Sequence, residues 1–205
     1  MASGMDSASW DRRYAGSELV WTAEPNRFLV AETETLAPGR AIDLACGEGR
    51  NAVWLAEHGW QAVGVDFSEV GLQKARELAT SRGVNVEWVA ANLLHYRPDP
   101  DAFDLVLVFY LQVPAADRRA ILQAAVEAVA LDGTLLVVAH DSSNLRDGHG
   151  GPQNPARLYT AEDVVTDIEG SGLLIERAER VERPVQTPDG EQIALDALLR
   201  AHRPE

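Results

Sequence analysis

Apolar residues gather in short continuous runs that alternate with stretches of helical spacing. Such runs are typical of buried strands, and they cover residues 41–45, 61–65, 85–91, 103–110 and 134–140. Between two of these runs, Leu72, Ala75 and Ala79 recur at the spacing of one helix face. Strands that alternate with helices predict an α/β fold, in which an open parallel sheet carries helices on both faces.

The C-terminal part of the chain breaks this alternation. Residues 173–185 and the alternating run 193–201 flank a Thr-Pro-Asp-Gly turn at 187–190. Two strands joined by a tight turn form a hairpin, so we expect the last strand to be antiparallel. The segment 141–157 holds five Gly and Pro residues, which predicts a long loop without helix or regular strand.

The strongest local signal is the stretch 41–55, which predicts a strand, a turn around Gly47 and Gly49, and then a helix. Two glycines separated by one residue allow positive φ angles and leave room for a ligand against the turn. The helix that follows points its unpaired N-terminal N–H groups toward the same place. This combination indicates a nucleotide-like ligand.

The kind of nucleotide depends on Asp43. The glycines, followed by Ala52 and later by Asp66, also fit the fingerprint of a dinucleotide site. A carboxylate just ahead of the turn, however, repels a pyrophosphate and attracts a ligand that carries an ammonium and a sulfonium. S-adenosylmethionine carries both groups, so the pattern favours it over NAD.

Residues 43–49 (Asp-Leu-Ala-Cys-Gly-Glu-Gly) and 63–66 (Val-Gly-Val-Asp) resemble motif I and the ribose-binding acid of class I S-adenosylmethionine-dependent methyltransferases. Ala45 stands where many members of that family carry a glycine. The resemblance implies a Rossmann-like sheet of about seven strands whose last strand is antiparallel, in agreement with the predicted hairpin. The N-terminal residues 10–14 and Trp21 resemble the start of small-molecule methyltransferases of the thiopurine and tellurite-resistance group.

The resemblance also implies roles for single residues. Asp43 would orient the amino group of the cofactor, Asp66 would bind both ribose hydroxyls, and the N-terminal segment would fold over the cofactor as a lid. As alternatives, the lid aromatics only anchor the segment, and Asn92 only shapes a turn. The residues expected at the cofactor are Tyr14, Trp21, Asp43, Ala45, Gly47, Gly49, Asp66, Phe67, Asn92, Leu93 and Phe109. No metal-ligand spacing accompanies them, so no metal is expected.

Two residues are candidates for catalysis, because they end the fourth and fifth predicted strands. His140 is predicted to act as general base, since a neutral imidazole accepts a proton at neutral pH. Tyr110 is predicted to face the acceptor. A hydrogen-bonded structural histidine and a core tyrosine are the alternatives. Displacement at an activated methyl carbon mainly needs alignment of donor and acceptor, so a base is optional.

Composition limits the remaining choices. With 205 residues, 46% of them hydrophobic and 24% charged, the chain fits one domain, divided into an N-terminal lid and helical extension (1–39) and a catalytic core (40–205). The formal charge of −14 disfavours a nucleic acid partner. One cysteine and no apolar run of membrane-spanning length favour a cytoplasmic protein without a membrane partner. The oligomeric state stays open.

These patterns favour an S-adenosylmethionine-dependent methyltransferase that acts on a small molecule by in-line displacement. An NAD-dependent oxidoreductase is an alternative, but it explains only the glycines and Asp66. A non-catalytic S-adenosylmethionine-binding module is another, and it leaves the aromatic lid and the glycine-rich loop without a purpose. The pattern does not predict whether the acceptor atom is O, N, S or a metalloid.

Overall fold

The computed structural model describes residues 7–16, 18–20 and 22–204 of the chain. Its helices and strands follow in the order α1 (Ser7–Tyr14), α2 (Arg27–Thr33), β1 (Arg40–Leu44), α3 (Arg50–Glu57), β2 (Gln61–Asp66), α4 (Glu69–Arg82), β3 (Glu87–Ala90), β4 (Phe103–Phe109), α5 (Ala115–Ala128), β5 (Val129–His140), α6 (Asn144–Asp147), η1 (Pro155–Arg157), α7 (Ala161–Asp167), β6 (Leu174–Thr187) and β7 (Gly190–His202).

The strands form one seven-stranded sheet in the order β3-β2-β1-β4-β5-β7-β6. Strands β1 to β5 pair in parallel, whereas β7 runs antiparallel to both β5 and β6. The predicted α/β fold, the sheet of about seven strands and the antiparallel last strand are therefore confirmed. That residues 1–205 form a single methyltransferase domain, divided after residue 39, stays a prediction.

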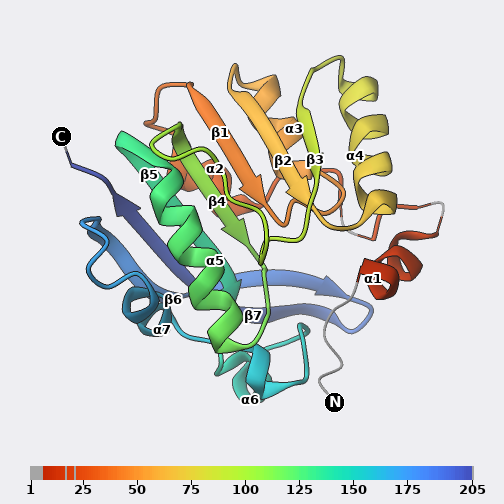
Figure 1. Ribbon diagram of the computed structural model, residues 1–205. Helices are drawn as coiled ribbons and strands as arrows, with labels where there is room; N and C mark the ends of the chain where they lie inside the picture. Colours follow the sequence, from red (N-terminus) through yellow and green to blue (C-terminus); the bar gives the residue numbers. More distant parts are fainter. Residues whose placement is uncertain (1–6, 17, 21, 205) are drawn as a thin grey trace.

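Helices cover both faces of the sheet, with α5 in front and α2 and α3 behind it (Figure 1). Ile42 and Leu44 of β1 pack in one apolar cluster with Ile121 and Leu122 of α5. The next residues along the strand point the other way, so Ala41 packs in a second cluster with Phe28 of α2. The core thus consists of two layers, one on each side of the sheet.

The helix ends follow the signals in the sequence. Asn26 and Ser68 cap α2 and α4 by accepting hydrogen bonds from backbone N–H groups. Gly83 ends α4 in a left-handed conformation with φ 69°, which suits a glycine. Thr160 and Asp163 form a capping box at the start of α7.

Two local predictions were wrong, and one helix was missed. The loop 141–157 contains one turn of α-helix, α6, which ends ahead of the glycines, and the 3₁₀ turn η1, which Asn154 caps and which begins with Pro155. Strand β5 begins at Val129 instead of residue 134 and includes an irregularity in its pairing with β4. Its residue Asp132 adopts a positive φ of 60° there. Helix α1 was not expected from the pattern of the N-terminal aromatics.

Candidate active site

The carboxyl ends of β1, β2, β4 and β5 meet at one edge of the sheet, where the strand order reverses between β1 and β4. Ligands of open parallel sheets bind at such a point. Because side chains alternate along a strand, Asp43, Asp66 and His140 share the sheet face that carries α2 and α3. Three of the predicted site residues are thus brought to one edge and one face.

The turn after β1 has the backbone conformation that the glycines predicted. Gly47 and Gly49 have φ angles of 55° and 79°. A Cβ atom on Gly49 would lie 2.5 Å from the Trp88 ring and 2.6 Å from Cβ of Ala75. Glycine is therefore required there by both conformation and space. Ala45 also has a positive φ, 67°, so this position is strained where many family members carry glycine.

Asp43 is the exceptional group of the site. Its residue is 1% exposed, and neither carboxylate oxygen has a hydrogen-bond partner. Burial, and then the nearby charge of Asp66, raise the pKa of Asp43 to about 7, while Arg50 acts in the opposite direction. A buried carboxylate without a partner is costly for a folded protein. A cationic ligand at this edge would supply what Asp43 lacks.

Asp66 is already held in place by the backbone. Its Oδ2 accepts from the Gly47 N–H at 2.9 Å, and its Oδ1 accepts from the Ser68 N–H at 2.9 Å. Burial raises the pKa of Asp66, and backbone hydrogen bonds from Ser68 and Gly47 oppose that shift. Each carboxylate oxygen keeps a further lone pair, so the side chain can also accept hydrogen bonds from two ligand hydroxyls.

Arg50, at the start of α3, was missed in the sequence. Burial lowers the pKa of its guanidinium, whereas Tyr110, Asp43 and Glu48 raise it. A basic residue directly after the glycine turn was a visible signal, because it places a cation at the end of the helix that faces the ligand.

The N-terminal segment lies over the turn. A Cβ atom on Gly47 would be 2.9 Å from the Tyr14 hydroxyl oxygen, and one on Gly71 would be 3.2 Å from the Tyr14 ring. The Ser68 hydroxyl donates to Asp11 of α1 at 2.5 Å. Tyr14 is therefore beside the predicted cofactor site. Trp21 lies outside the described residues.

Residues 18–20 also lie over the glycine turn, and Glu48 and Lys74 hold them there. The carboxylate of Glu48, a buried residue of the glycine turn, accepts from the Val20 N–H at 3.0 Å and from Lys74 Nζ at 3.1 Å. Lys74 also donates to the Glu18 carbonyl at 2.5 Å. Sequence reasoning did not single out Glu48, although an acidic residue between two turn glycines was a signal.

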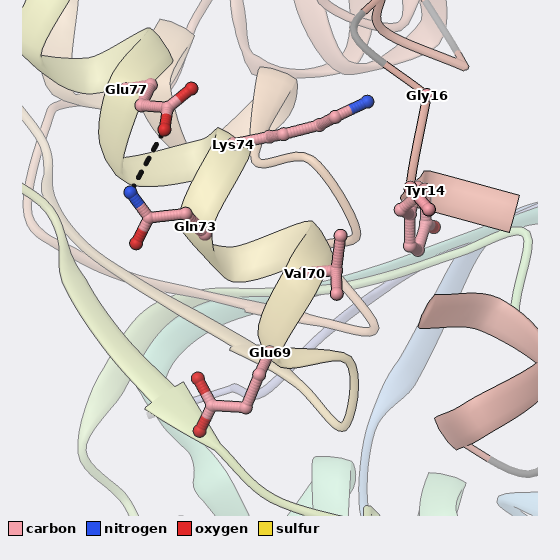
Figure 2. Close-up of a pocket in the computed structure, with 8 residues that line it drawn as sticks. Tyr14, Gly16, Glu69, Val70, Gln73, Lys74 and Glu77 are labelled. Atoms are coloured by element: carbon pink, nitrogen blue, oxygen red, sulfur yellow. Dashed lines mark hydrogen bonds between the residues drawn. The ribbon is translucent and has the colours of Figure 1, made fainter. Parts of the chain in front are cut away.

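A shallow pocket lies between the end of α1 and the first turns of α4 (Figure 2). Of the predicted cofactor-binding residues that the structure describes, only Tyr14 lines it; the other lining residues include Glu69, Gln73 and Lys74. Because Lys74 is engaged by Glu48 and Gln73 donates to Glu77, the polar lining is already paired. We place the candidate site at Asp43 and not in this pocket.

Four further residues expected at the cofactor differ in their exposure. Leu93 is buried in the core cluster, Phe67 is half-buried, and Phe109 is buried on the face of α2. Asn92 is exposed, and its Oδ1 accepts from the Leu94 N–H at 2.9 Å, which is a turn-shaping contact. The cofactor roles of these residues stay predictions.

His140 and Tyr110 belong to a polar cluster with Asp196 and Arg183, which sequence reasoning missed. Asp196 is fully buried on β7, directly opposite His140 of β5. The Tyr110 hydroxyl donates to Asp196 at 2.8 Å, and Arg183 Nε donates to it at 2.6 Å. Asp196 interrupts the apolar run 193–199, which was a usable signal, whereas Arg183 lies in a strand of mixed charge and gave none.

Within the described ranges, no three His, Cys, Asp or Glu side chains are grouped so that they could hold a metal ion. In the same part of the chain, no helix is both long and apolar enough to cross a membrane. Cys46 is buried in the turn, and burial, followed by the charges of Asp43 and Asp66, raises the pKa of its thiol well above the usual value. It is therefore a protonated packing residue.

Comparison with known proteins finds methyltransferases. Residues 41–133 match the model of a methyltransferase domain. The chain is 26% identical over 179 residues to thiocyanate methyltransferase 1 of Arabidopsis thaliana, which covers 84% of this chain and 77% of the relative. It is also 26% identical over 180 residues to a 2-heptyl-1-hydroxyquinolin-4(1H)-one methyltransferase of Mycobacteroides abscessus, with 80% and 79% covered.

The fold is shared with solved methyltransferases. The N-methyltransferase NodS from Bradyrhizobium japonicum, solved with S-adenosylhomocysteine, superposes with a TM-score of 0.72 at 20% identity, covering 97% of this chain and 98% of that one. S-adenosylmethionine, the cofactor that the sequence favoured over NAD, is the cofactor of this group. The family match, the relatives and the shared fold support a class I S-adenosylmethionine-dependent methyltransferase.

Proposed function

We propose that the chain transfers a methyl group from S-adenosylmethionine to a small-molecule acceptor by in-line displacement. The observation that carries the proposal is Asp43, a buried carboxylate without a hydrogen-bond partner next to a glycine turn. An ammonium group would compensate this charge, whereas a pyrophosphate would be repelled by it. The donor supplies a methyl carbon that its sulfonium has activated.

The chain's own residues would bind and orient the donor. Asp43 would take the amino group, Asp66 the two ribose hydroxyls, and Gly47 and Gly49 would admit the ligand against the backbone. Arg50, beside Asp43, would pair with the carboxylate of the methionine part. Tyr14 would cover the methyl donor and exclude water, which raises the effective concentration of donor and acceptor.

A small acceptor is supported by two relatives that match most of the chain, since one is named for thiocyanate and the other for a hydroxyquinolone. The negative formal charge of −14 argues against a nucleic acid. A location in the cytoplasm is part of the same proposal.

Titration calorimetry with S-adenosylhomocysteine and with NADH tests the cofactor. We expect heat and a raised melting temperature with the former and neither with the latter. The isosteric variant Asp43→Asn should bind S-adenosylhomocysteine more weakly, with the exposed Asp99→Asn as matched control. Binding of NADH without any response to S-adenosylhomocysteine would reverse the proposal.

Transfer of a labelled methyl group to thiocyanate, phenol and 2-mercaptoethanol tests the acceptor. Transfer to at least one of these probes supports a small-molecule enzyme. The protein could instead bind S-adenosylhomocysteine tightly and transfer no methyl group to any small acceptor, including a 1-hydroxyquinolin-4-one. That result would favour a non-catalytic binding module.

A further inference from the structure

Four strands, β4 to β7, contribute to one buried polar cluster at the sheet edge. Asp196 of β7 is 0% exposed and is the centre of the cluster. It accepts from Arg183 of β6 and from the Tyr110 hydroxyl at the end of β4. His140 Nδ1 of β5 lies 3.3 Å from its Oδ1, within ion-pair range although not aligned as a hydrogen bond. One carboxylate therefore organises three neighbours.

The carboxylate of Asp196 is charged. Burial alone raises its pKa, but the contacts with His140 and Arg183 outweigh burial and bring the pKa below its usual value. Burial, and next the charge of Asp196, raise the pKa of Tyr110, so this hydroxyl keeps its proton. The cluster thus contains one ion pair, Asp196 with Arg183, and a tyrosine that acts as donor. Tyr110 is not available as a base.

The orientation of His140 follows from these contacts. Nδ1 faces a carboxylate, which favours the tautomer that carries the proton on Nδ1. The Tyr110 ring lies against the imidazole with centroids 5.0 Å apart, and a Cβ on Gly151 would come within 2.9 Å of the imidazole. The side chain is 14% exposed. Nε2, on the side of the ring away from Asp196, is then the nitrogen left to accept a proton.

The surroundings of His140 are charged on several sides. Tyr110 faces it from β4 and Asp196 from β7, while Arg183 of β6 lies over the Tyr110 ring, 5.5 Å from its centroid. Arg50 of α3 interacts electrostatically with Tyr110 and Arg183 of the same cluster. Since Asp196 compensates the charge of Arg183, the cluster presents Nε2 of His140 to an acceptor, and not the charge of a free arginine.

We propose that Asp196 is a positioning residue that directs Nε2 of His140 toward the acceptor, and that the acceptor carries a dissociable O–H or S–H group. This inference rests on the proposed function. The acceptor proton moves to Nε2 of His140, and the lone pair of the oxygen or sulfur forms the bond to the methyl carbon. The electron pair of the broken carbon–sulfur bond stays on the sulfur of the donor.

The first test observes the imidazole without any acceptor. Long-range ¹⁵N–¹H NMR of the protein, free and with S-adenosylhomocysteine, should show His140 protonated on Nδ1, and Asp196→Asn should disturb this tautomer. The matched control is Asp167→Asn, because Asp167 is also buried and paired with an arginine, at 2.5 Å from Arg118, but has no histidine partner. An unchanged tautomer in Asp196→Asn would overturn the positioning role.

The second test compares acceptors that differ in their proton. Phenol and 2-mercaptoethanol lose a proton on methylation, whereas thiocyanate has none to lose. In Asp196→Asn and in His140→Gln we expect kcat for the protic probes to fall roughly 100-fold with little change in KM. The rate with thiocyanate and the affinity for S-adenosylhomocysteine should stay at the level of Asp167→Asn. The two protic probes also separate a hydroxyl from a thiol acceptor.

The outcomes are distinguishable. If the unmodified enzyme does not bind S-adenosylhomocysteine, the proposed function is wrong. The orientation of His140 is tested separately, by the NMR measurement. An equal fall in the rates with protic probes and thiocyanate would assign Asp196 a purely structural role. An enzyme that methylates thiocyanate and neither protic probe would overturn the assigned acceptor class.

Discussion

At the β1–β2 half of the sheet edge, the carboxylate of Asp43 is buried without a partner, whereas at the β5–β7 half the carboxylate of Asp196 has three. Both residues are almost fully buried, at 1% and 0% exposure. Their pKa values accordingly shift in opposite directions, to about 7 for Asp43 and below the usual value for Asp196. Burial is the same in both places, so the difference comes from the partners.

This difference separates two uses of a buried charge. The carboxylate of Asp43 costs folding stability, and we infer that a cationic ligand compensates it. The carboxylate of Asp196 is compensated within the protein, so it can fix the geometry of its neighbours before any ligand arrives. Under the proposed function, the β1–β2 half, or donor half, is thus complete only with its ligand, while the β5–β7 half, or acceptor half, is preorganised.

The largest expected effect is on the acceptor half. Asp196→Ala leaves the half-buried Arg183 guanidinium and the Tyr110 hydroxyl without their acceptor. Removal of one partner of a buried ion pair costs on the order of 3–5 kcal/mol of the free energy of unfolding. Urea denaturation measures it, with the exposed Asp189→Ala expected within about 0.5 kcal/mol of the parent. A loss for Asp196→Ala as small as that of the control would show that the cluster is not an energetic unit.

In the donor half, by contrast, removal of the carboxylate charge should raise the free energy of unfolding. A carboxyl whose pKa is raised in the folded state, here from 3.8 to about 7, stabilises the fold below about pH 4 and loses that contribution as the pH rises through about 7. Asparagine does not titrate. We therefore expect Asp43→Asn to be more stable than the parent at pH 8, on the order of 2–4 kcal/mol, and similar to it at pH 4.

Urea denaturation of both proteins without ligand, from pH 4 to pH 8, gives the measurement. The same variant should bind S-adenosylhomocysteine less well at every pH above about 7, because the ammonium loses its counter-ion. If the free energy of unfolding depends on pH in the same way in parent and variant, the charge on Asp43 does not destabilise the fold. The comparison between the two halves would then fail.

The donor half was predictable because its residues lie within one short stretch. Asp43, the turn glycines and Asp66 belong to one strand–turn–helix–strand unit, so local spacing alone places them together. The cap at Ser68 and the antiparallel hairpin were likewise fixed by neighbours in sequence. Local chemistry determines such features, and it is visible without the fold.

The acceptor half was not predictable in the same way. Tyr110 and Asp196 are 86 positions apart, and Arg183 reaches Asp196 from the neighbouring strand of the hairpin. Their contact depends on the insertion of β7 between β5 and β6 and on the register that pairs His140 with Asp196. A register slip of one residue would turn Asp196 to the other face. Sequence patterns predicted the hairpin but not this register.

The ribose-binding acid gives a prediction of intermediate size. Asp66→Ala removes charge-assisted hydrogen bonds to the ribose and should weaken binding of S-adenosylhomocysteine by about 2 kcal/mol, or roughly 30-fold. Calorimetry on Asp66→Ala and on the exposed Asp99→Ala measures the difference. Because Asp66 also holds the Gly47 N–H, part of the loss reflects a looser turn. Unchanged affinity would place the ribose elsewhere.

The smallest expected effect concerns the segment that covers the donor half. Glu48 binds both the Val20 N–H and Lys74, and Lys74 binds the Glu18 carbonyl, so one buried carboxylate holds residues 18–20 against the glycine turn. Glu48→Gln keeps an oxygen that can accept from Val20 but loses the charge that attracts Lys74. We expect a loss of about 1 kcal/mol in the closure of this segment, which makes its opening about fivefold more frequent.

Hydrogen exchange of the peptide that covers residues 7–20 reports this opening. Exchange should slow when S-adenosylhomocysteine binds and should be about fivefold faster in Glu48→Gln than in the parent. In Glu48→Gln we expect kcat to fall while the free energy of unfolding of the whole protein changes little, because the segment excludes water from the donor. Glu77→Gln, an exposed position on α4, is the matched control and should behave as the parent. Equal exchange in parent and Glu48→Gln would mean that residues 18–20 are held by packing alone, and that charge secures only the acceptor half of the site.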